Sequence, residues 1–325
     1  MSGNSLPKRR LGKSNIPVTE MGLGLWAIGG DSWGPTDDRD SLDTIDAALE
    51  AGVNFFDTAD VYGAGHSEEL LGQAMRGRRD RFIVATKIGW QGFDAKRNTT
   101  AYTRVDKLLA GVESNLRRLQ TDYVDLIQSH IDFREPTMEV FLEGFQKLQQ
   151  QGKVRAYGLS TSDLDYLKAF NADGCCSSLQ IDYSLLNRTP EAEIFPYCQE
   201  QGIGVIVRGP LAMGILTGKF RPDTRFDEHD WRQRWQKNKE EREIYLADLE
   251  RVRDLEVLFP GRDLAQLALQ FVLSHPAVTT VIPGAKTMRQ LRQNLVAAGK
   301  PLSVKELGSI AQVVPPGGGR KIWPA

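Results

Sequence analysis

The stretch 105–130, VDKLLAGVESNLRRLQTDYVDLIQSH, combines a helical pattern with a strand that follows it directly. One helical stripe carries the apolar residues Val105, Leu108, Leu109, Val112, Leu116 and Leu119. The run Val124–His130 is short, apolar and bounded by polar residues, as expected of a buried strand. A helix that covers a sheet and leads into the next strand is the repeating unit of a parallel α/β fold.

The same alternation extends along the chain from about residue 23 to residue 298, without a linker rich in Pro or Ser. Eight strands are predicted, at Leu23–Ile28, Asn54–Ala59, Phe82–Ile88, Val124–His130, Val154–Ser160, Ser178–Tyr183, Gly204–Arg208 and Val278–Pro283. Gly52, Gly152 and Gly202 each end a helical stretch just before a strand, where glycine accepts the left-handed C-cap conformation. We predict an α/β fold, a (β/α)8 TIM barrel, in a single domain covering residues 1–325.

A doubly wound sheet is the structural alternative. It would place a glycine-rich phosphate loop directly after the first strand, and Gly29-Gly30 does not match G-x-G-x-x-G. Two segments fall outside the alternation. Residues 8–21 are expected to form an N-terminal β-hairpin at the bottom of the barrel, and residues 218–240 a long loop after the seventh strand. Long loops in compact domains are usually functional.

Composition excludes several classes of partner. Lys plus Arg (41) balance Asp plus Glu (42), so no basic field attracts nucleic acid or a membrane surface. The first ten residues lack an apolar segment and no window reaches eighteen apolar residues, which predicts a cytoplasmic protein. The three cysteines show no C-x-x-C spacing, and the four histidines lie far from them, so we expect reduced thiols and no metal site.

Four polar residues are predicted at one end of the barrel. Asp57, Lys87 and His130 end the second, third and fourth strands, and Tyr62 lies in the loop after Asp57. Active sites of such barrels lie at this end. Hydride addition to a carbonyl leaves an alkoxide that needs a proton, and Tyr62 can donate it. Lys87 would lower the pKa of Tyr62, Asp57 would orient Lys87, and His130 could bond the substrate oxygen.

Each of these residues alone has an ordinary explanation. Asp57 could cap a helix, Lys87 could be a solvated strand-end charge, and Tyr62 could be a packed loop aromatic. His130 alone is more often a core imidazole than a catalyst. Their joint occurrence on three consecutive strands favours the catalytic interpretation.

The pattern Asp57-x-x-x-x-Tyr62-Gly63, followed by Glu68-x-x-Leu71-Gly72, resembles the signature of the aldo-keto reductase superfamily. The resemblance extends from Gly22 to Gly284. It implies a (β/α)8 barrel with the catalytic residues Asp57, Tyr62, Lys87 and His130. It also implies an NADP(H) cofactor, with NADH as a possibility, bound extended without a Rossmann domain. The implied reaction reduces aldehydes or ketones to alcohols, or runs in reverse, with Tyr62 as general acid/base.

The resemblance also implies a set of cofactor-binding residues: Gly24, Trp26, Ser160, Thr161, Gln180, Arg208, Gly209, Pro210, Leu211, Ala212, Gly214, Lys219, Arg225, Gly284, Lys286, Gln290, Gln293 and Asn294. Ser160, Thr161 and Gln180 would hold the nicotinamide carboxamide, with Thr161 replacing the usual Asn. Arg208 replaces an aromatic ring and can stack on the nicotinamide through its planar guanidinium.

The remaining assignments concern the phosphates and the adenine. Lys219 and Arg225 would reach the pyrophosphate from the long loop, although a solvated basic stretch is the simpler explanation for that loop. Lys286 and Gln290 would contact the 2′-phosphate at a helix start, which suits an anion. Gln293, in place of the usual Glu, and Asn294 would contact adenine.

Three tryptophans, Trp26, Trp90 and Trp231, could wall an apolar substrate pocket for a small carbonyl or alcohol. The sequence leaves the assembly open between a monomer and a homo-oligomer.

Two other functions fit parts of the pattern. Lys87 could form a Schiff base in a lyase. The motifs GPLA-x-G-x-LTGK (209–219) and IPGA (282–285) also resemble those of potassium-channel β subunits, which are regulatory barrels. Such subunits can carry a long N-terminal extension, and this chain begins about twenty residues before its first strand, which favours a stand-alone enzyme.

Overall fold

Eight parallel strands form the central sheet of the computed structural model, which describes residues 6–30, 32–93, 99–132 and 137–320. In chain order and in sheet order they are β3 (Leu23–Gly24), β4 (Phe55–Asp57), β5 (Ile83–Ile88), β8 (Val124–Ser129), β9 (Val154–Ser160), β10 (Ser178–Asp182), β11 (Gly204–Arg208) and β12 (Val278–Val281). Each neighbour in the sheet is therefore also the next strand along the chain, as in a barrel.

The sheet closes on itself between its first and last strands. The Gly22 N–H donates to the Val281 carbonyl at 2.8 Å, and the Val281 N–H donates to the Glu20 carbonyl at 2.9 Å. Gly24 and Gly284 form a further parallel bridge. This closure confirms the predicted (β/α)8 barrel and excludes the doubly wound sheet.

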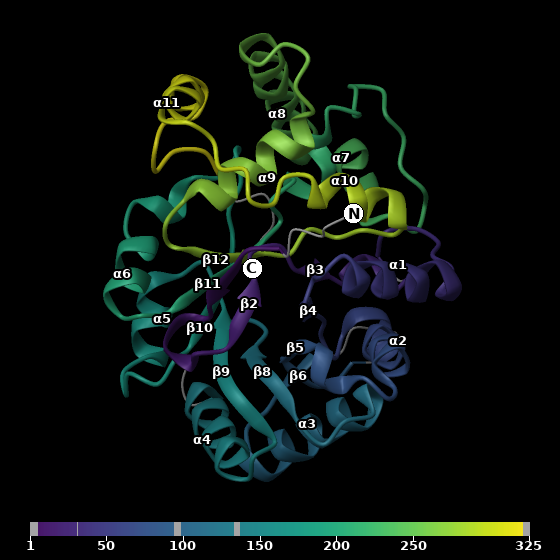
Figure 1. Ribbon diagram of the computed structural model, residues 1–325, viewed down its shortest axis with the longest axis vertical. Coiled ribbons are helices and arrows are strands. Elements are labelled where there is room, and N and C mark those ends of the chain that lie inside the picture. Colours follow the sequence, from purple (N-terminus) through teal and green to yellow (C-terminus); the bar gives the residue numbers. More distant parts are fainter. Residues whose placement is uncertain (1–5, 31, 94–98, 133–136, 321–325) are drawn as a thin grey trace.

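Helices connect the strands and surround them (Figure 1). They are α1 (Asp38–Glu50), α2 (His66–Met75), α3 (Val105–Leu119), α4 (Thr137–Gln150), α5 (Leu164–Phe170), α6 (Ile194–Glu200), α9 (Leu264–Ser274) and α10 (Met288–Leu295). The predicted stripe of α3 faces inward, with Leu108, Val112, Leu116 and Leu119 buried. The predicted C-cap glycines Gly52, Gly152 and Gly202 have φ of 92°, 72° and 62°.

The predicted N-terminal hairpin is confirmed as β1 (Lys8–Arg10) and β2 (Pro17–Thr19). Its side chains Leu11, Ile16 and Val18 are buried in a small apolar cluster with residues from the strands, including Phe55, Ala85, Leu126, Ala156, Ile206 and Ile282. The Lys13 N–H donates to the Gly202 carbonyl, just before β11 begins. The hairpin therefore fills the end of the barrel where the strands start.

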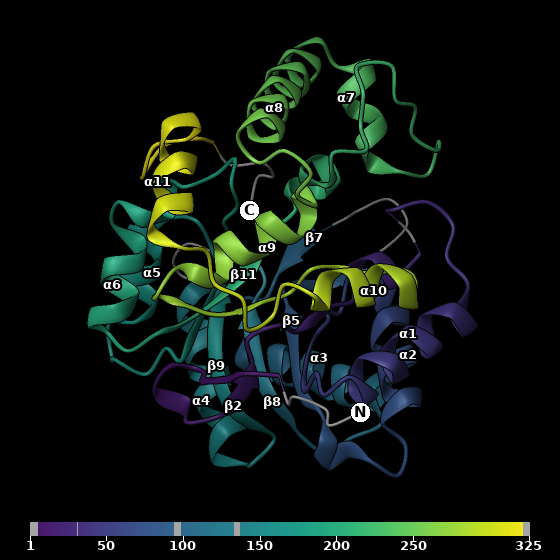
Figure 2. The ribbon, with the colours of Figure 1, turned by 45° about the horizontal axis from the view of Figure 1, so that its top comes forward.

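The long connection after β11 is partly helical, which the sequence did not predict. Residues 218–230 are irregular, but a 3-10 turn at Trp231–Gln233 and α7 (Arg234–Lys237) follow. Asp230 and Asn238 cap the turn and the next helix, α8 (Lys239–Leu258), through their side chains. Helices α7 and α8 stand out from the barrel in Figures 1 and 2.

Other elements lie outside the repeat. They are β6 (Trp90–Phe93), which pairs with β7 (Thr99–Ala101), and α11 (Val304–Val313), which starts with the capping box Ser303–Glu306.

Six of the eight predicted strands are too long: the first, second and eighth by four, three and two residues, and the third, fourth and sixth by one. The first leaves the sheet after Gly24: the Leu25 N–H still donates to the Asp57 carbonyl of β4 at 2.9 Å, and a 3-10 turn, Trp26–Ile28, begins at the next residue. The last ends at Val281, close to Pro283, which has no N–H for the ladder. The proposed domain bounds 1–325 include residues outside the described ranges and stay a prediction.

Candidate active site

The four predicted catalytic residues meet at the carboxyl ends of β4, β5 and β8. Asp57 is the last residue of β4, Lys87 is the penultimate residue of β5, and His130 follows β8. Tyr62 begins a 3-10 turn, Tyr62–Gly65, in the connection from β4 to α2. Parallel strands in register bring their ends together, so residues far apart in sequence become neighbours.

Lys87 joins two of the other three residues. Its Nζ donates to Asp57 Oδ1 at 2.6 Å, to Tyr62 Oη at 3.1 Å and to the Thr58 carbonyl at 2.9 Å. Lys87 and Asp57 are 0% and 2% exposed, so this ion pair is shielded from water. All three ammonium donors have acceptors, as a buried Lys requires.

The turn that presents Tyr62 depends on glycine. Gly63 has φ of 60°, and a Cβ there would lie 2.2 Å from the Gly29 carbonyl oxygen. A side chain at residue 63 would therefore collide with backbone in the loop after β3. The Tyr-Gly pair of the sequence signature has a steric cause at this position.

Lys87 is charged and Tyr62 is protonated in this arrangement. Burial lowers the pKa of Lys87, but Asp57 and Tyr62 more than offset it, so the pKa is raised. Burial raises the pKa of Tyr62, and Lys87 lowers it only in part. The expected direction of the Lys87 effect is found, but the expected net lowering of the Tyr62 pKa is wrong because burial of the hydroxyl is the larger effect.

His130 packs beside Tyr62 as a neutral imidazole. The two ring centroids lie 5.7 Å apart in an edge-to-face arrangement. Burial, followed by the charges of Lys87 and Arg208, holds the pKa of His130 well below its usual value. Its buried Nδ1 has no hydrogen-bond partner among the described residues. The ring can therefore hydrogen-bond a ligand without carrying a charge.

A cavity of about 500 Å³ opens beside Asp57 and Tyr62. Most of the predicted cofactor-binding residues line it: Gly24, Trp26, Gln180, Arg208, Gly209, Pro210, Leu211, Gly214, Lys219, Gly284, Lys286, Gln290, Gln293 and Asn294. Arg208 Nη2 is buried and has no partner among the described residues, so a ligand group can accept from it. Gln180 Nε2 donates to Asp57 Oδ2 at 2.8 Å, which ties this wall to the ion pair.

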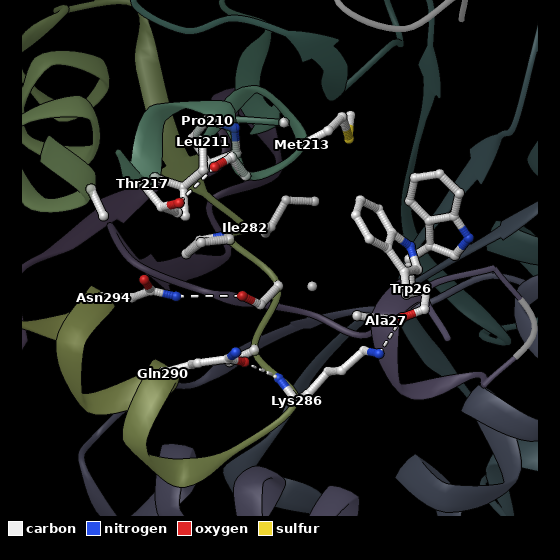
Figure 3. A pocket seen from close by; sticks show the side chains of 18 of the residues that line it. Trp26, Ala27, Pro210, Leu211, Met213, Thr217, Ile282, Lys286, Gln290 and Asn294 are labelled. Carbon is white, nitrogen blue, oxygen red and sulfur yellow. Dashed lines mark hydrogen bonds between the residues drawn. The ribbon is translucent and has the colours of Figure 1, made fainter. Parts of the chain in front are cut away.

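The far end of the cavity is formed by the start of α10 (Figure 3). Gln290 Oε1 accepts from the Lys286 N–H at 2.8 Å, and Asn294 Nδ2 donates to the Gly284 carbonyl at 3.4 Å. The Lys286 ammonium reaches across to the carbonyls of Trp33 and Gly34, in the loop after β3. Burial lowers the pKa of Lys286.

Four predicted cofactor residues do not line the cavity. Arg225 is exposed on the irregular segment, and its contact with the pyrophosphate stays a prediction. Ser160 and Thr161 are buried at the end of β9, where Thr161 Oγ1 accepts from the Asp163 N–H at 2.9 Å. Ala212 is a buried residue of the 3-10 segment Ala212–Thr217.

Comparison with known proteins identifies the fold and its family. The profile of the Aldo/keto reductase family matches residues 20–315. The chain belongs to this family. The aldo-keto reductase YhdN of Bacillus subtilis is 34% identical over 86% of this chain and 84% of its own. The holo form of aldo-keto reductase AKR11C1 from Bacillus halodurans superposes with a TM-score of 0.80 at 32% identity, over 95% of this chain and 96% of its own.

An aldo/keto reductase from Klebsiella pneumoniae, solved in complex with NADP and acetate, gives a TM-score of 0.73 at 26% identity, over 98% of this chain and 99% of its own. Family membership confirms the predicted enzyme class, a NAD(P)H-dependent aldo-keto reductase. None of the described helices combines the length and apolar character needed to span a membrane. The described residues also hold no cluster of three or more His, Cys, Asp or Glu able to bind a metal.

The aromatic wall of this aldo/keto reductase differs from the predicted one, since of Trp26, Trp90 and Trp231 only Trp26 lines the cavity. Trp26 stacks on Tyr62 at 6.0 Å and on Trp231 at 6.5 Å, with interplanar angles of 24° and 13°. Trp33, which the sequence analysis missed, packs edge-on against both tryptophans. Trp90 lies 5.7 Å from His130. Trp26 and Trp33 line the cavity themselves, whereas Trp231 supports them from behind and Trp90 flanks His130.

Arg232 was also missed, and it fixes the long connection to the barrel. Its guanidinium pairs with Asp230, donates to the Met213 carbonyl at 3.1 Å and lies 4.8 Å from the Trp33 ring centroid. In the sequence, Arg232 could have been found from its position next to Trp231 in a charged loop. Phe220, another missed residue, packs 5.5 Å from the same guanidinium.

We predict that Asp60→Asn makes the protein less sensitive to rising pH. Burial first, and then the charge of Glu68, raise the pKa of Asp60 from 3.8 to about 8. Between these values an unfolded chain releases the proton while the folded protein retains it, so the stability contributed by Asp60 falls as pH rises through this window. The melting temperature of the variant relative to wild type should be roughly 2 °C or more higher at pH 8 than at pH 4. A difference in melting temperature between variant and wild type that is the same at every pH would contradict the raised pKa.

Proposed function

We propose that this aldo/keto reductase reduces aldehydes or ketones with NADPH, or oxidises the alcohols in reverse, with Tyr62 as general acid/base. The observation that carries the proposal is the buried chain of hydrogen bonds from Asp57 through Lys87 to Tyr62. Tyr62 lines the cavity, and the Lys87 ammonium is held against its hydroxyl. The Klebsiella neighbour that holds NADP supports the choice of cofactor.

The cavity fits a phosphorylated dinucleotide in charge and shape. Arg208, Lys219, Arg232 and Lys286 place four cationic side chains along its walls, against Asp57 and Asp263. The cations extend from beside Tyr62 to the start of α10, which suits an extended molecule with anionic groups. Arg208 would lie against the nicotinamide, Lys219 against the pyrophosphate, and Lys286 with Gln290 against the 2′-phosphate.

The residues around Tyr62 then have separate roles. Bound NADPH would supply the hydride to the carbonyl carbon. Tyr62 Oη donates its proton to the alkoxide that develops, and the Lys87 ammonium stabilises the phenolate left behind. Asp57 keeps Lys87 charged and oriented. The neutral His130 ring hydrogen-bonds the substrate oxygen and so positions the carbonyl without competing as an acid.

A panel of aldehydes, ketones and sugars, assayed by loss of NADPH or NADH absorbance, tests this function. Turnover of one or more carbonyls supports it, and the same panel identifies the substrate class. Binding of NADPH without any turnover would favour the regulatory role known from channel β subunits. The Schiff-base alternative needs a neutral amine, whereas Asp57 and Tyr62 hold Lys87 in its charged form. Borohydride trapping of a substrate on Lys87 would support the Schiff-base alternative.

Residues 218–237, here called the lid, pack over one side of the cavity. Lys219, Phe220 and Arg232 line the cavity, and the Trp231 N–H donates to the Ser32 carbonyl at 3.0 Å. The irregular part of the lid has few regular backbone hydrogen bonds, since residues 218–230 form no helix or strand. We propose that the lid closes more firmly on bound cofactor, because Lys219 then gains an anionic partner.

We predict that NADPH protects the lid from proteolysis. Trypsin should cut the free protein first between Lys219 and Lys239, at exposed sites such as Arg225, and saturating NADPH should slow this cleavage at least about tenfold. Arg253, an exposed basic residue of α8 outside this segment, serves as the internal control, because the cofactor should not protect it. Equal cleavage rates with and without NADPH would separate the lid from the cofactor site.

A further inference from the structure

Glu68 belongs to the sequence signature, but the catalytic proposal gives it no role. It lies on α2, is 0% exposed, and accepts a hydrogen bond from Thr86 Oγ1 at 2.5 Å. Its other oxygen accepts from Arg118 Nε at 2.7 Å, across to α3. A fully buried carboxylate is costly unless it is paired in this way.

The Glu68–Arg118 pair is part of a closed ring of hydrogen bonds that begins and ends at β5. Arg118 Nη2 donates to Asn115 Oδ1 at 3.0 Å, and Asn115 Nδ2 donates to the carbonyl of Lys87 at 3.2 Å. The ring therefore holds β5 at two adjacent residues, at the Thr86 side chain and at the Lys87 backbone. The Asp60 N–H donates to the same Lys87 carbonyl at 3.2 Å.

This ring lies on the outer face of the barrel wall, behind the catalytic lysine. Ala85 packs in the interior cluster with the N-terminal hairpin, and successive residues of a strand point to opposite faces. Thr86 therefore points out toward α2 and α3, and Lys87 points back into the barrel. The ring can set the position of Lys87 without touching the reacting atoms.

Arg118 also contacts the turn that carries Tyr62. A Cβ on Gly65, the last residue of that turn, would lie 2.5 Å from Arg118 Cδ and 2.7 Å from Nε. The Gly65 backbone thus rests on the arginine side chain, and its φ of 99° also favours glycine. One guanidinium supports both the strand of Lys87 and the turn of Tyr62.

We infer that Glu68 and Arg118 are positioning residues, which together fix the separation between the Lys87 ammonium and the Tyr62 hydroxyl. This inference rests on the proposed role of Tyr62 as the acid. Loss of the pair should leave the cavity and its cofactor residues in place. It removes a support from the strand that carries Lys87 and from the turn that carries Tyr62. The charged groups around Glu68 are Arg118, Lys87 and Asp60, and burial raises the pKa of Glu68 against the charge of Arg118.

The chain offers a matched control at the other end of the same strand. Asp125 is 1% exposed, pairs with Arg79 at 2.9 Å and also with Arg155 at 2.6 Å, and accepts the Val84 N–H at 2.9 Å. Its side-chain burial and that of Arg79 are close to those of Glu68 and Arg118. Both pairs therefore tie β5 to the rest of the barrel, but only one of them is near Lys87.

The test compares Glu68→Gln, Arg118→Met and Arg118→Lys with Asp125→Asn and Arg79→Met. We expect Arg118→Met to lower kcat about 10- to 100-fold, since misplacement of catalytic groups by about 1 Å costs this much. Glu68→Gln should lower kcat less than Arg118→Met does. Arg118→Lys should keep part of the kcat that Arg118→Met loses. KM and the Kd for NADPH should stay within about twofold. The control variants should lose comparable thermal stability but keep kcat.

A second measurement needs no substrate. The apparent pKa of Tyr62, obtained from ultraviolet phenolate titration of each protein minus its Tyr62→Phe counterpart, should rise in Glu68→Gln and Arg118→Met, because Lys87 no longer lowers it as effectively. An unchanged Tyr62 pKa and kcat in folded variants would overturn the inference, as would an equal loss of kcat in the controls. If Tyr62→Phe itself keeps full activity, the proposed function fails instead, and the titration still reports on the positioning pair.

Discussion

Tyr62→Phe should lower turnover by about 10²- to 10⁴-fold, the usual loss when a general acid is removed. The hydroxyl of Tyr62 accepts from Lys87 Nζ at 3.1 Å and faces the cavity, so its loss removes the proposed proton donor and leaves the rest of the wall intact. The phenyl ring can still stack on Trp26. The Kd for NADPH, measured by quenching of protein fluorescence, should change less than about threefold.

The control for this variant is a tyrosine of equal chemistry outside the site. Tyr197→Phe also removes one hydroxyl that forms a hydrogen bond, accepting from Asn171 Nδ2 at 3.3 Å, but it lies on α6, away from the cavity. It should keep turnover near the wild-type value. Near wild-type turnover in Tyr62→Phe would remove Tyr62 from the mechanism, whatever the effect on stability.

Lys286→Glu should weaken NADPH binding by roughly 100-fold and leave NADH binding nearly unchanged. The proposed 2′-phosphate would lose a charge-assisted hydrogen bond and face a carboxylate instead, and each such change costs on the order of 1–3 kcal/mol. NADH lacks this phosphate. The structure places Lys286 at the cavity wall beside Gln290, at the start of α10.

Arg289→Glu is the matched control, because it makes the same charge change on an exposed residue of the same helix. It should leave both affinities within about twofold. Equal weakening of NADPH and NADH by Lys286→Glu would place Lys286 away from the phosphate. The result would then assign its role to the contacts with Trp33 and Gly34.

The sequence predicts most of the barrel because local patterns determine it. Strands such as Val154–Ser160 and Gly204–Arg208 have the predicted bounds, since apolar runs and C-cap glycines mark them. The first strand is shorter than predicted because residues 26–28 form a 3-10 turn, in which Trp26 packs against Trp33 and against Tyr62 from another loop. No local pattern contains that information.

The site residues also fall into those that the sequence predicts and those that it does not. Asp57, Tyr62, Lys87 and His130 follow from strand order alone, and the structure brings them together. Arg232 and Trp33 could not be found in this way, because their importance comes from contact between two loops distant in sequence. The net direction of the Tyr62 pKa also depends on burial of its hydroxyl, which outweighs the charge of Lys87.

The N-terminal hairpin has a consequence for the order of folding. Leu11, Ile16 and Val18 are synthesised before the other members of the cluster they enter, which include the distant residues Ile206 and Ile282. Contacts of such large sequence separation are slow to form, because the loop-closure entropy is lost before the contacts compensate for it. Complete packing of the hairpin therefore needs Ile206 and Ile282, and until they are in place Leu11 and its neighbours keep apolar surface that chaperones can bind.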